Sequence, residues 1–253
     1  MIFFTACSLT AFMLLNCFPT TDTSFLYGQP CSDRNTAYLY ATTWRLPPQK
    51  EINCVDITGL SKTLNSKIDL SNFTAFFQMA SHTDTLYADS MNLTRFPIAI
   101  VHSFPNVETI DMSFNNITAL PQKMYKIAPK LTKLLLSQNR VVMPKRKPVL
   151  SSPTLHTLML SNNKIRKIYK VSFVRLPALE VLYLDGNSLR YISPDMFSPM
   201  KKLKYLHLGQ NFLGEIPPKT AMPTSITHYI VKSQKKLNRR SIRHGNRRKQ
   251  FSQ

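Results

Sequence analysis

The stretch that decides the fold is LEVLYLDGNSLRYI, which runs from Leu179 to Ile192. Leucine stands at its first, fourth and sixth positions, and asparagine stands at its ninth. Related stretches recur with a constant period of 24, and they are VETIDMSFNNI from Val107, LTKLLLSQNRV from Leu131, LHTLMLSNNKI from Leu155 and LKYLHLGQNFL from Leu203, with a weaker unit, TDTLYADSMNL, from Thr83. The chain is therefore built on a repeat of constant length.

This period predicts a solenoid, because one unit this short cannot bury its own apolar side chains. The L-x-L alternation has period two, which indicates a short strand whose leucines point inward and whose intervening residues point outward. We predict an α/β-type solenoid, a horseshoe with short parallel strands on its concave face and a mostly irregular convex side. The concave face is the side of the strands that is turned away from the core.

An asparagine recurs at one position of every complete unit. Its amide carries both donors and acceptors, so it can bond the backbone of neighbouring coils where the chain leaves the strand. An ordinary turn asparagine would not explain five in register. The predicted ladder consists of Asn115, Asn139, Asn163, Asn187 and Asn211.

These units resemble the leucine-rich repeats of extracellular proteins such as Toll-type receptor ectodomains, Slit and chondroadherin. EINCVDITGL and SKIDLSNFTAFF resemble the N-terminal cap of that family, and the resemblance implies a cap strand with Ile68 and Leu70. The usual C-terminal cysteine cap is missing, since no cysteine follows Cys54. Instead, SITHYIVK continues the phase, so Ile230 is expected at the next inward strand position.

The first residues, MIFFTACSLTAFMLLNCF, form a short apolar run without charged side chains. We interpret residues 1–20 as a secretory signal peptide, with an N-terminal signal anchor as the alternative. Glycosylation sequons begin at Asn72, Asn92 and Asn116, which supports secretion and an extracellular location. In an oxidising compartment Cys31 and Cys54 would form a disulfide, and two free buried thiols are the alternative.

The predicted domain organisation follows from these segments. Residues 1–20 are the signal peptide, and residues 21–82 are an N-terminal cap with one disulfide. Residues 83–231 hold about six repeats and a terminal imperfect strand. Residues 232–253 are a basic tail that should be disordered when free.

The net charge of +20 is unevenly placed along the chain. Residues 112–179 carry thirteen basic and no acidic side chains, and residues 216–253 carry ten and none. Such a surface attracts polyanions, here a sulfated glycan or an acidic membrane surface, although solubility alone is the plainer interpretation. The candidate polyanion-binding residues are Lys145, Arg146, Lys147, Lys164, Arg166, Lys167, Arg239, Arg240, Arg247 and Arg248.

The outward strand positions are the candidate partner-binding site. Toward the C-terminal repeats they form an apolar and aromatic strip that we expect to be exposed, and Tyr is a common hot-spot residue. A surface stripe without function, or a patch covered by the C-terminal tail, are the alternatives. The strip consists of Leu135, Met159, Val181, Tyr183, Tyr205 and His207, and Asp69, Tyr87 and Asp111 are expected to continue one of its columns.

No nucleophile elbow, phosphate loop or metal-ligand spacing occurs in the sequence, so we expect no enzyme activity, metal or cofactor. The favoured function is a secreted protein that binds an extracellular protein or receptor through its concave face, held at the matrix or cell surface by basic loops and tail. Alternatives are a soluble Toll-like receptor decoy or immune modulator, and a non-catalytic subunit of an extracellular enzyme complex. Nucleic-acid binding inside the cell is a further alternative, which the signal peptide disfavours.

Overall fold

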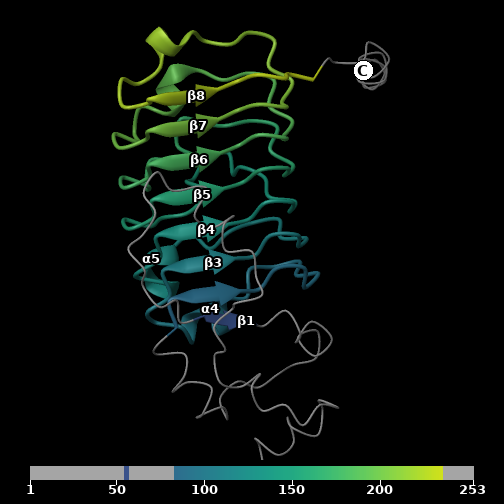
Figure 1. The fold of residues 1–253 in the computed structure, drawn as a ribbon, viewed down its shortest axis with the longest axis vertical. Coiled ribbons are helices and arrows are strands. Elements are labelled where there is room, and N and C mark those ends of the chain that lie inside the picture. Colours follow the sequence, from purple (N-terminus) through teal and green to yellow (C-terminus); the bar gives the residue numbers. More distant parts are fainter. Residues whose placement is uncertain (1–53, 57–82, 236–253) are drawn as a thin grey trace, which may run out of the picture.

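The computed structural model describes residues 54–56 and 83–235. Eight three-residue strands form one parallel sheet in which spatial order follows sequence order (Figure 1). The strands are β1 (Cys54–Asp56), β2 (Thr85–Tyr87), β3 (Thr109–Asp111), β4 (Lys133–Leu135), β5 (Thr157–Met159), β6 (Val181–Tyr183), β7 (Tyr205–His207) and β8 (His228–Ile230). The predicted α/β solenoid of stacked leucine-rich repeats is confirmed.

The constant repeat length of the sequence sets which residues pair between neighbouring strands. From β2 to β7 each central residue pairs with the equivalent residue of the next repeat. This inward column is fully buried and consists of Leu86, Ile110, Leu134, Leu158, Leu182 and Leu206. Because neighbouring residues of a strand point to opposite faces, the first and third residues of the strands from β2 to β8 form the concave face.

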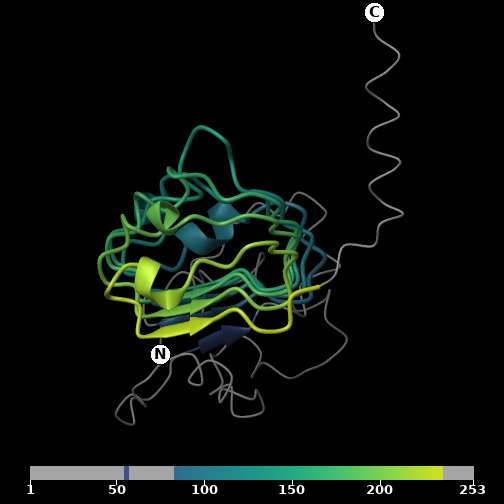
Figure 2. The ribbon, with the colours of Figure 1, turned by 90° about the horizontal axis from the view of Figure 1, so that it is seen from above.

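A second apolar column closes the core on the convex side. Phe173 and Phe197 occupy equivalent positions of successive coils and are fully buried. Short helices on this side are α4 (Ile98–His102), α5 (Met124–Ile127), and the 3-10 turns η4 (Pro194–Met196) and η5 (Lys219–Ala221). Figure 2 looks along the stack and shows α4 and α5 on the side opposite the strands.

The two ends of the sheet differ from the sequence predictions. The strand beside β2 is Cys54–Asp56, with Val55 opposite Leu86, so the expected cap strand at Ile68 and Leu70 does not hold that place. Residues 68–70 lie outside the described part of the chain. The expected column residue Asp69 is likewise replaced in the register by Asp56, which lies opposite Tyr87.

At the other end, Leu206 pairs with Tyr229 and not with Ile230. The last unit is thus one residue shorter than the others, and the prediction for Ile230 was wrong. Tyr229 and Val231 pack against the core, while Ile230 lies opposite His207. The physical reason is the pattern of apolar residues, because Ile226, Tyr229 and Val231 repeat the spacing of Leu203, Leu206 and Leu208.

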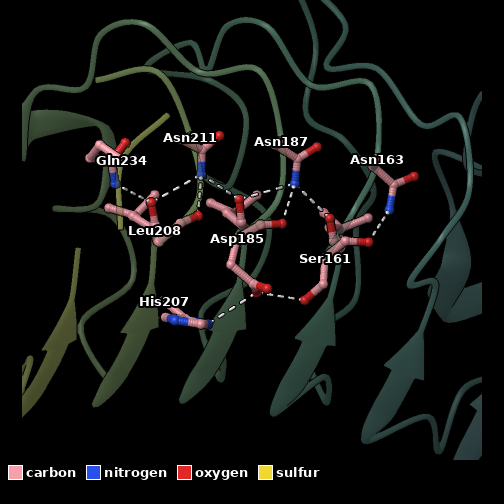
Figure 3. Close-up of polar contacts among 11 residues, drawn as sticks. Ser161, Asn163, Asp185, Asn187, His207, Leu208, Asn211 and Gln234 are labelled. Carbon is pink, nitrogen blue, oxygen red and sulfur yellow. Dashed lines mark hydrogen bonds and ion pairs between the residues drawn. The ribbon is translucent and has the colours of Figure 1, made fainter. Parts of the chain in front are cut away.

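The asparagine side chains bridge the coils where the chain leaves the strands (Figure 3). The Asn187 amide donates to the carbonyl of Leu160 at 2.8 Å, in the preceding coil, and to that of Leu184 at 3.0 Å in its own. Its Oδ1 accepts the N–H of Ile165 at 3.1 Å. Equivalent bonds are made by Asn115, Asn139, Asn163 and Asn211.

The ladder has a further rung that the sequence analysis missed. Gln234 Nε2 donates to the carbonyl of Leu208 at 3.0 Å, and its Oε1 accepts the N–H of Leu213 at 3.1 Å. The step from Asn211 to Gln234 is one position shorter than the step from Asn187 to Asn211, as is the step from Leu206 to Tyr229. The longer glutamine side chain therefore completes the last coil of the ladder.

Substitution of Leu182 by Ala tests the inward column. Leu182 is fully buried, so we expect the free energy of unfolding to fall by about 2–5 kcal/mol through lost transfer energy and a cavity. Ile216→Ala is the control, because that side chain is 40% exposed and should matter far less. Chemical denaturation measures both, and equal effects of the two substitutions would contradict the column.

Substitution of Asn187 by Ala tests the ladder. The change leaves the Ile165 N–H and the Leu160 carbonyl buried without their partner, so a loss of about 2–4 kcal/mol is expected. Asn116→Ala is the control, because its amide bonds only Asn92 at the surface. Urea unfolding of both variants measures the effect, and a tolerated Asn187→Ala would show that the ladder adds little stability.

Candidate functional site

The concave face divides into a closed part and an accessible part. Tyr87, Leu135 and Met159 form a separate apolar cluster on this face, and Tyr183 packs against it. Leu135 is fully buried, and Met159 and Val181 are each only 4% exposed. The prediction that Leu135, Met159 and Val181 belong to an exposed strip was therefore wrong.

The spacing of the strands accounts for part of this burial. Adjacent parallel strands lie about 4.8 Å apart, so side chains of one column cover each other's flanks. Asp111 interrupts the apolar column and is also buried, with its carboxylate accepting the N–H of Ser113 at 2.8 Å. The N-terminal half of the face consequently offers less surface than the sequence indicated.

The last strands carry the accessible part, which we call the aromatic platform. It consists of Tyr183, Tyr205, His207 and His228. The ring centroids of Tyr183 and Tyr205 lie 5.0 Å apart, and His207 meets Tyr183 edge-on at 5.7 Å. His228 stacks on Tyr205 with 6.1 Å between centroids. Tyr183, Tyr205 and His207 are partly exposed and His228 is exposed.

His228 is a platform residue that the sequence analysis missed. It lies opposite Tyr205 only because the last unit is one position shorter than the others. An unchanged period places Tyr229 at that position instead. The signal that could have found His228 was the apolar spacing of Ile226, Tyr229 and Val231, which sets the register without assuming a period.

A polar chain runs along one edge of the platform (Figure 3). Ser161 Oγ donates to Asp185 Oδ1 at 2.6 Å, and His207 Nδ1 lies 3.1 Å from the same oxygen. The second contact becomes an ion pair only when the His207 ring is protonated. Burial alone raises the pKa of Asp185, but its contacts with His207 and Ser161 outweigh burial and hold that pKa below the ordinary value.

The contacts of Ser161, Asp185 and His207 hold side chains in position and do not activate a nucleophile. In a serine hydrolase the histidine stands between serine and carboxylate, because it must accept the serine proton. Here the carboxylate of Asp185 stands between Ser161 and His207, so the serine is not activated as a nucleophile. The contacts instead hold the His207 ring against Tyr183 and Tyr205.

The concave face also carries a lysine that the candidate residues omitted. Lys133 is partly buried at the first position of β4. Burial lowers its pKa, and the negative charge of Glu108 opposes that effect. Burial thus disfavours the charged form of Lys133, as expected where the N-terminal half of the face is closed to water.

The candidate polyanion-binding residues lie away from the strands. Lys145, Arg146 and Lys147 are exposed on the loop that follows β4, and Lys164, Arg166 and Lys167 are exposed on the next coil. None of these six takes part in an ion pair within the described residues. The remaining candidates, Arg239, Arg240, Arg247 and Arg248, lie outside the described part of the chain.

The other predicted sites are only partly covered by the structure. Asn92 is exposed and Asn116 is partly exposed, and their side chains meet on neighbouring coils through a hydrogen bond. Asn72 and Cys31 lie outside the described residues, as do residues 1–20, and only the backbone strand of Cys54 is described.

Among the described residues there is neither a membrane-spanning helix nor a metal-binding cluster. No helix there is long and apolar enough to pass through a membrane. No group of three or more His, Cys, Asp or Glu side chains in this part of the chain is arranged to hold a metal ion.

Comparison with known proteins agrees with the repeat pattern. The family model described as leucine rich repeat matches residues 153–213, which span the coils of β5, β6 and β7. Residues 153–213 are leucine-rich repeats. Domains of this family are typically non-catalytic and generally bind protein partners. No curated protein matches the sequence.

One solved structure similar to this chain is described as the crystal structure of the APL1 leucine-rich repeat domain. The TM-score is 0.46 at 20% sequence identity, with 66% of this chain and 40% of that chain covered. This chain thus spans less than half the length of the structure it matches.

Substitution of Asp185 by Asn tests whether the contacts of Asp185 with Ser161 and His207 stabilise the fold. The folded-state pKa lies below the ordinary 3.8, so the carboxylate stabilises the fold above that pH and this contribution is lost as the pH falls through the folded-state pKa. We expect Asp185→Asn to lower the free energy of unfolding by about 1–2 kcal/mol at neutral pH and to flatten its acid dependence.

Thermal or urea unfolding between neutral pH and about pH 2 measures this effect. Asp195→Asn is the control, because the Lys170–Asp195 pair is exposed to solvent and screened. An unchanged acid dependence in Asp185→Asn would contradict the stabilising role of the contacts with Ser161 and His207.

Proposed function

We propose that this leucine-rich repeat protein binds a protein partner outside the cell, through the aromatic platform of its concave face. The observation that carries the proposal is the packed group of Tyr183, Tyr205, His207 and His228 on the last three strands. Tyrosine concentrates binding energy at protein interfaces, because its ring is large and apolar and its hydroxyl can form hydrogen bonds.

Rigidity of the strands supports this proposal. Each platform residue stands on a strand whose central residue is anchored in the core, namely Leu182, Leu206 or Tyr229. The ladder fixes the turns that follow, with Asn187, Asn211 and Gln234 bonded across neighbouring coils. A rigid surface loses little conformational entropy on binding, so more of the contact energy remains as affinity.

The platform has charges of both signs at its border. Lys204 Nζ lies 2.9 Å from a Glu180 carboxylate oxygen, and Asp185 is in contact with His207. Polar groups around an apolar centre favour a particular orientation of a partner more than they add affinity. We therefore expect the partner to contribute an apolar or aromatic anchor surrounded by polar groups.

Extracellular location is the other half of the proposal. The apolar first residues, three sequons and the cysteine pair support passage through the secretory route. Asn92 is exposed and accessible in the folded state, as a glycan acceptor must be. Treatment of the protein from its own cells with an endoglycosidase should lower its mass, and an unchanged mass would show that the sequons are not used and so give secretion no support.

Partner capture tests the platform. The protein serves as bait in extracellular fluid, and captured proteins are quantified by mass spectrometry for the wild type and for Tyr183→Ala/Tyr205→Ala. Met159 is not substituted, because it is buried and its loss would disturb folding. We expect the double variant to lose partner capture by 30-fold or more, that is by about 2 kcal/mol or more, as expected for a hot spot.

The matched control is Tyr125→Ala/Tyr191→Ala, which removes two exposed tyrosines that lie outside the strands. It should retain capture. Equal capture by both double variants would refute the platform as the binding site. A protein that the wild type and the control capture, but the platform variant does not, also separates the alternatives. A captured receptor would indicate a decoy, and a captured enzyme activity would indicate a subunit of an enzyme complex.

A further inference from the structure

A surface hollow of about 340 Å³ lies between two consecutive coils, beyond the ladder asparagines that follow β4 and β5. Its lining residues come from the two coils and are Val142, Met143, Lys164, Arg166, Lys167 and Tyr169. Val142 and Arg166 are one repeat apart, as are Met143 and Lys167, so each pair occupies equivalent positions of adjacent coils. The hollow is separate from the concave face.

The hollow exists because the coil after β4 is irregular. Residues 142–148 include Pro144 and Pro148, which lack an N–H for bonding to a neighbouring coil. At the preceding coil Val142 N–H donates to the Thr118 carbonyl at 3.2 Å, whereas no equivalent bond joins Arg166 N–H to Val142 in the described structure. The two coils are joined by the Lys164 N–H, which donates to the Val141 carbonyl at 3.2 Å, but they have no such bond one step further along, between Arg166 and Val142.

The C-terminal end of the irregular loop is nevertheless fixed. The Gln122 side chain donates to the Pro148 carbonyl at 2.9 Å, and the Val149 N–H donates to the Ser172 carbonyl at 2.9 Å. Lys145, Arg146 and Lys147 are exposed on this loop, next to Met143 on the wall of the hollow. Figure 2 shows a loop in the teal-green colour of this region standing out on the side away from the strands.

The charges of the hollow are uncompensated. Lys164, Arg166 and Lys167 are exposed, and none has an ion pair among the described residues. The nearest carboxylates in sequence are Asp111 and Glu180, because residues 112–179 contain no Asp or Glu. Lys170, on the same coil, differs from these three residues because its ammonium forms an ion pair with Asp195 at 2.6 Å. Three cationic groups around one concavity attract an anion with several acceptor oxygens.

We propose that this hollow and the adjoining loop bind a sulfated glycan chain, with a sulfate group seated among Lys164, Arg166 and Lys167. The cations of 145–147 extend the positive surface beyond the hollow, which suits a chain of repeated anionic groups better than a single free anion. The exposed Val142 and the partly buried Tyr169 supply apolar surface for the C–H faces of sugar rings.

The lining disfavours two other polyanions. Single-stranded nucleic acid is held by successive aromatic side chains on which bases stack, and Tyr169 is the one aromatic residue that lines the hollow. An acidic membrane is held by a basic surface together with a broad apolar face that inserts, whereas Val142 is the one exposed apolar side chain that lines the hollow, since Met143 is buried and Tyr169 is partly buried.

The test measures binding of a heparin-derived octasaccharide to the full chain as a function of salt. The site variant is Lys164→Ala/Arg166→Ala/Lys167→Ala. The matched control is Arg95→Ala/Lys201→Ala/Lys202→Ala, which removes the same residue types and the same charge from exposed positions that have no ion pair among the described residues. Circular dichroism verifies that both variants are folded.

We expect the site variant to lose tenfold or more in affinity and the salt slope of log K to fall by about 1 for each lost contact, whereas the control changes little. The basic tail is present in all three proteins, so it contributes equally. Lysine acylation footprinting adds a local measurement, in which the octasaccharide should protect Lys164 and Lys167 and leave Lys201 and Lys202 reactive.

The same measurements name the results that overturn the proposal. Equal losses in the two triple variants would show an effect of net charge alone, and absence of protection at Lys164 and Lys167 would place the glycan elsewhere. Undiminished binding of a desulfated octasaccharide, or tighter site-dependent binding of oligo-dT or of phosphatidylserine vesicles, would assign another ligand class. Because the platform residues are untouched, this test fails or succeeds independently of partner capture.

Discussion

The structure depends on the buried amide that each coil sends to its neighbour. Where the chain turns out of a strand, backbone carbonyls and N–H groups are buried at positions where the backbone of the next coil is too far away to form hydrogen bonds with them. Asn115, Asn139, Asn163, Asn187 and Asn211 bond these groups across coils, and each of these residues is at most 5% exposed. Because unpaired buried polar groups are costly, the ladder fixes one way of stacking and excludes slipped registers.

That constraint makes the surface a consequence of the core. Once the inward residues of β6, β7 and β8 are fixed, Tyr183 must lie beside His207, and Tyr205 beside His228, on the opposite face. Residues 142–148 leave the regular path just beyond the ladder bonds of Asn139 and Asn163, and a hollow lies there between the two coils. A protein of this design can therefore carry one rigid site on its strands and a different site on an irregular loop.

The sequence predicted the strands β2 to β7 because each unit repeats one spacing of apolar residues, and the inward leucines follow from it. It failed at β8 because a constant period was carried past Leu206, although the pattern of Ile226, Tyr229 and Val231 marks a shorter unit. It failed at the other end because Cys54–Asp56 belongs to no repeat, so no period could place that strand beside β2.

The site was harder to predict than the fold. Alternation states which face a residue is on, but it does not state how far neighbours cover it, so the burial of Leu135, Met159 and Val181 was missed. The list of basic residues did include Lys164, Arg166 and Lys167, yet their arrangement around a hollow depends on the path of the preceding coil, which no local pattern encodes.

Backbone nuclear Overhauser contacts test the stacked coils most directly. Across residues 83–235 we predict contacts between neighbouring parallel strands that pair Leu158 with Leu182 in the regular repeats and Leu206 with Tyr229 in the shortened last one. Contacts confined to residues close in sequence, close Hα–Hα pairs of antiparallel strands, or pairing of Leu206 with Ile230 would contradict the account.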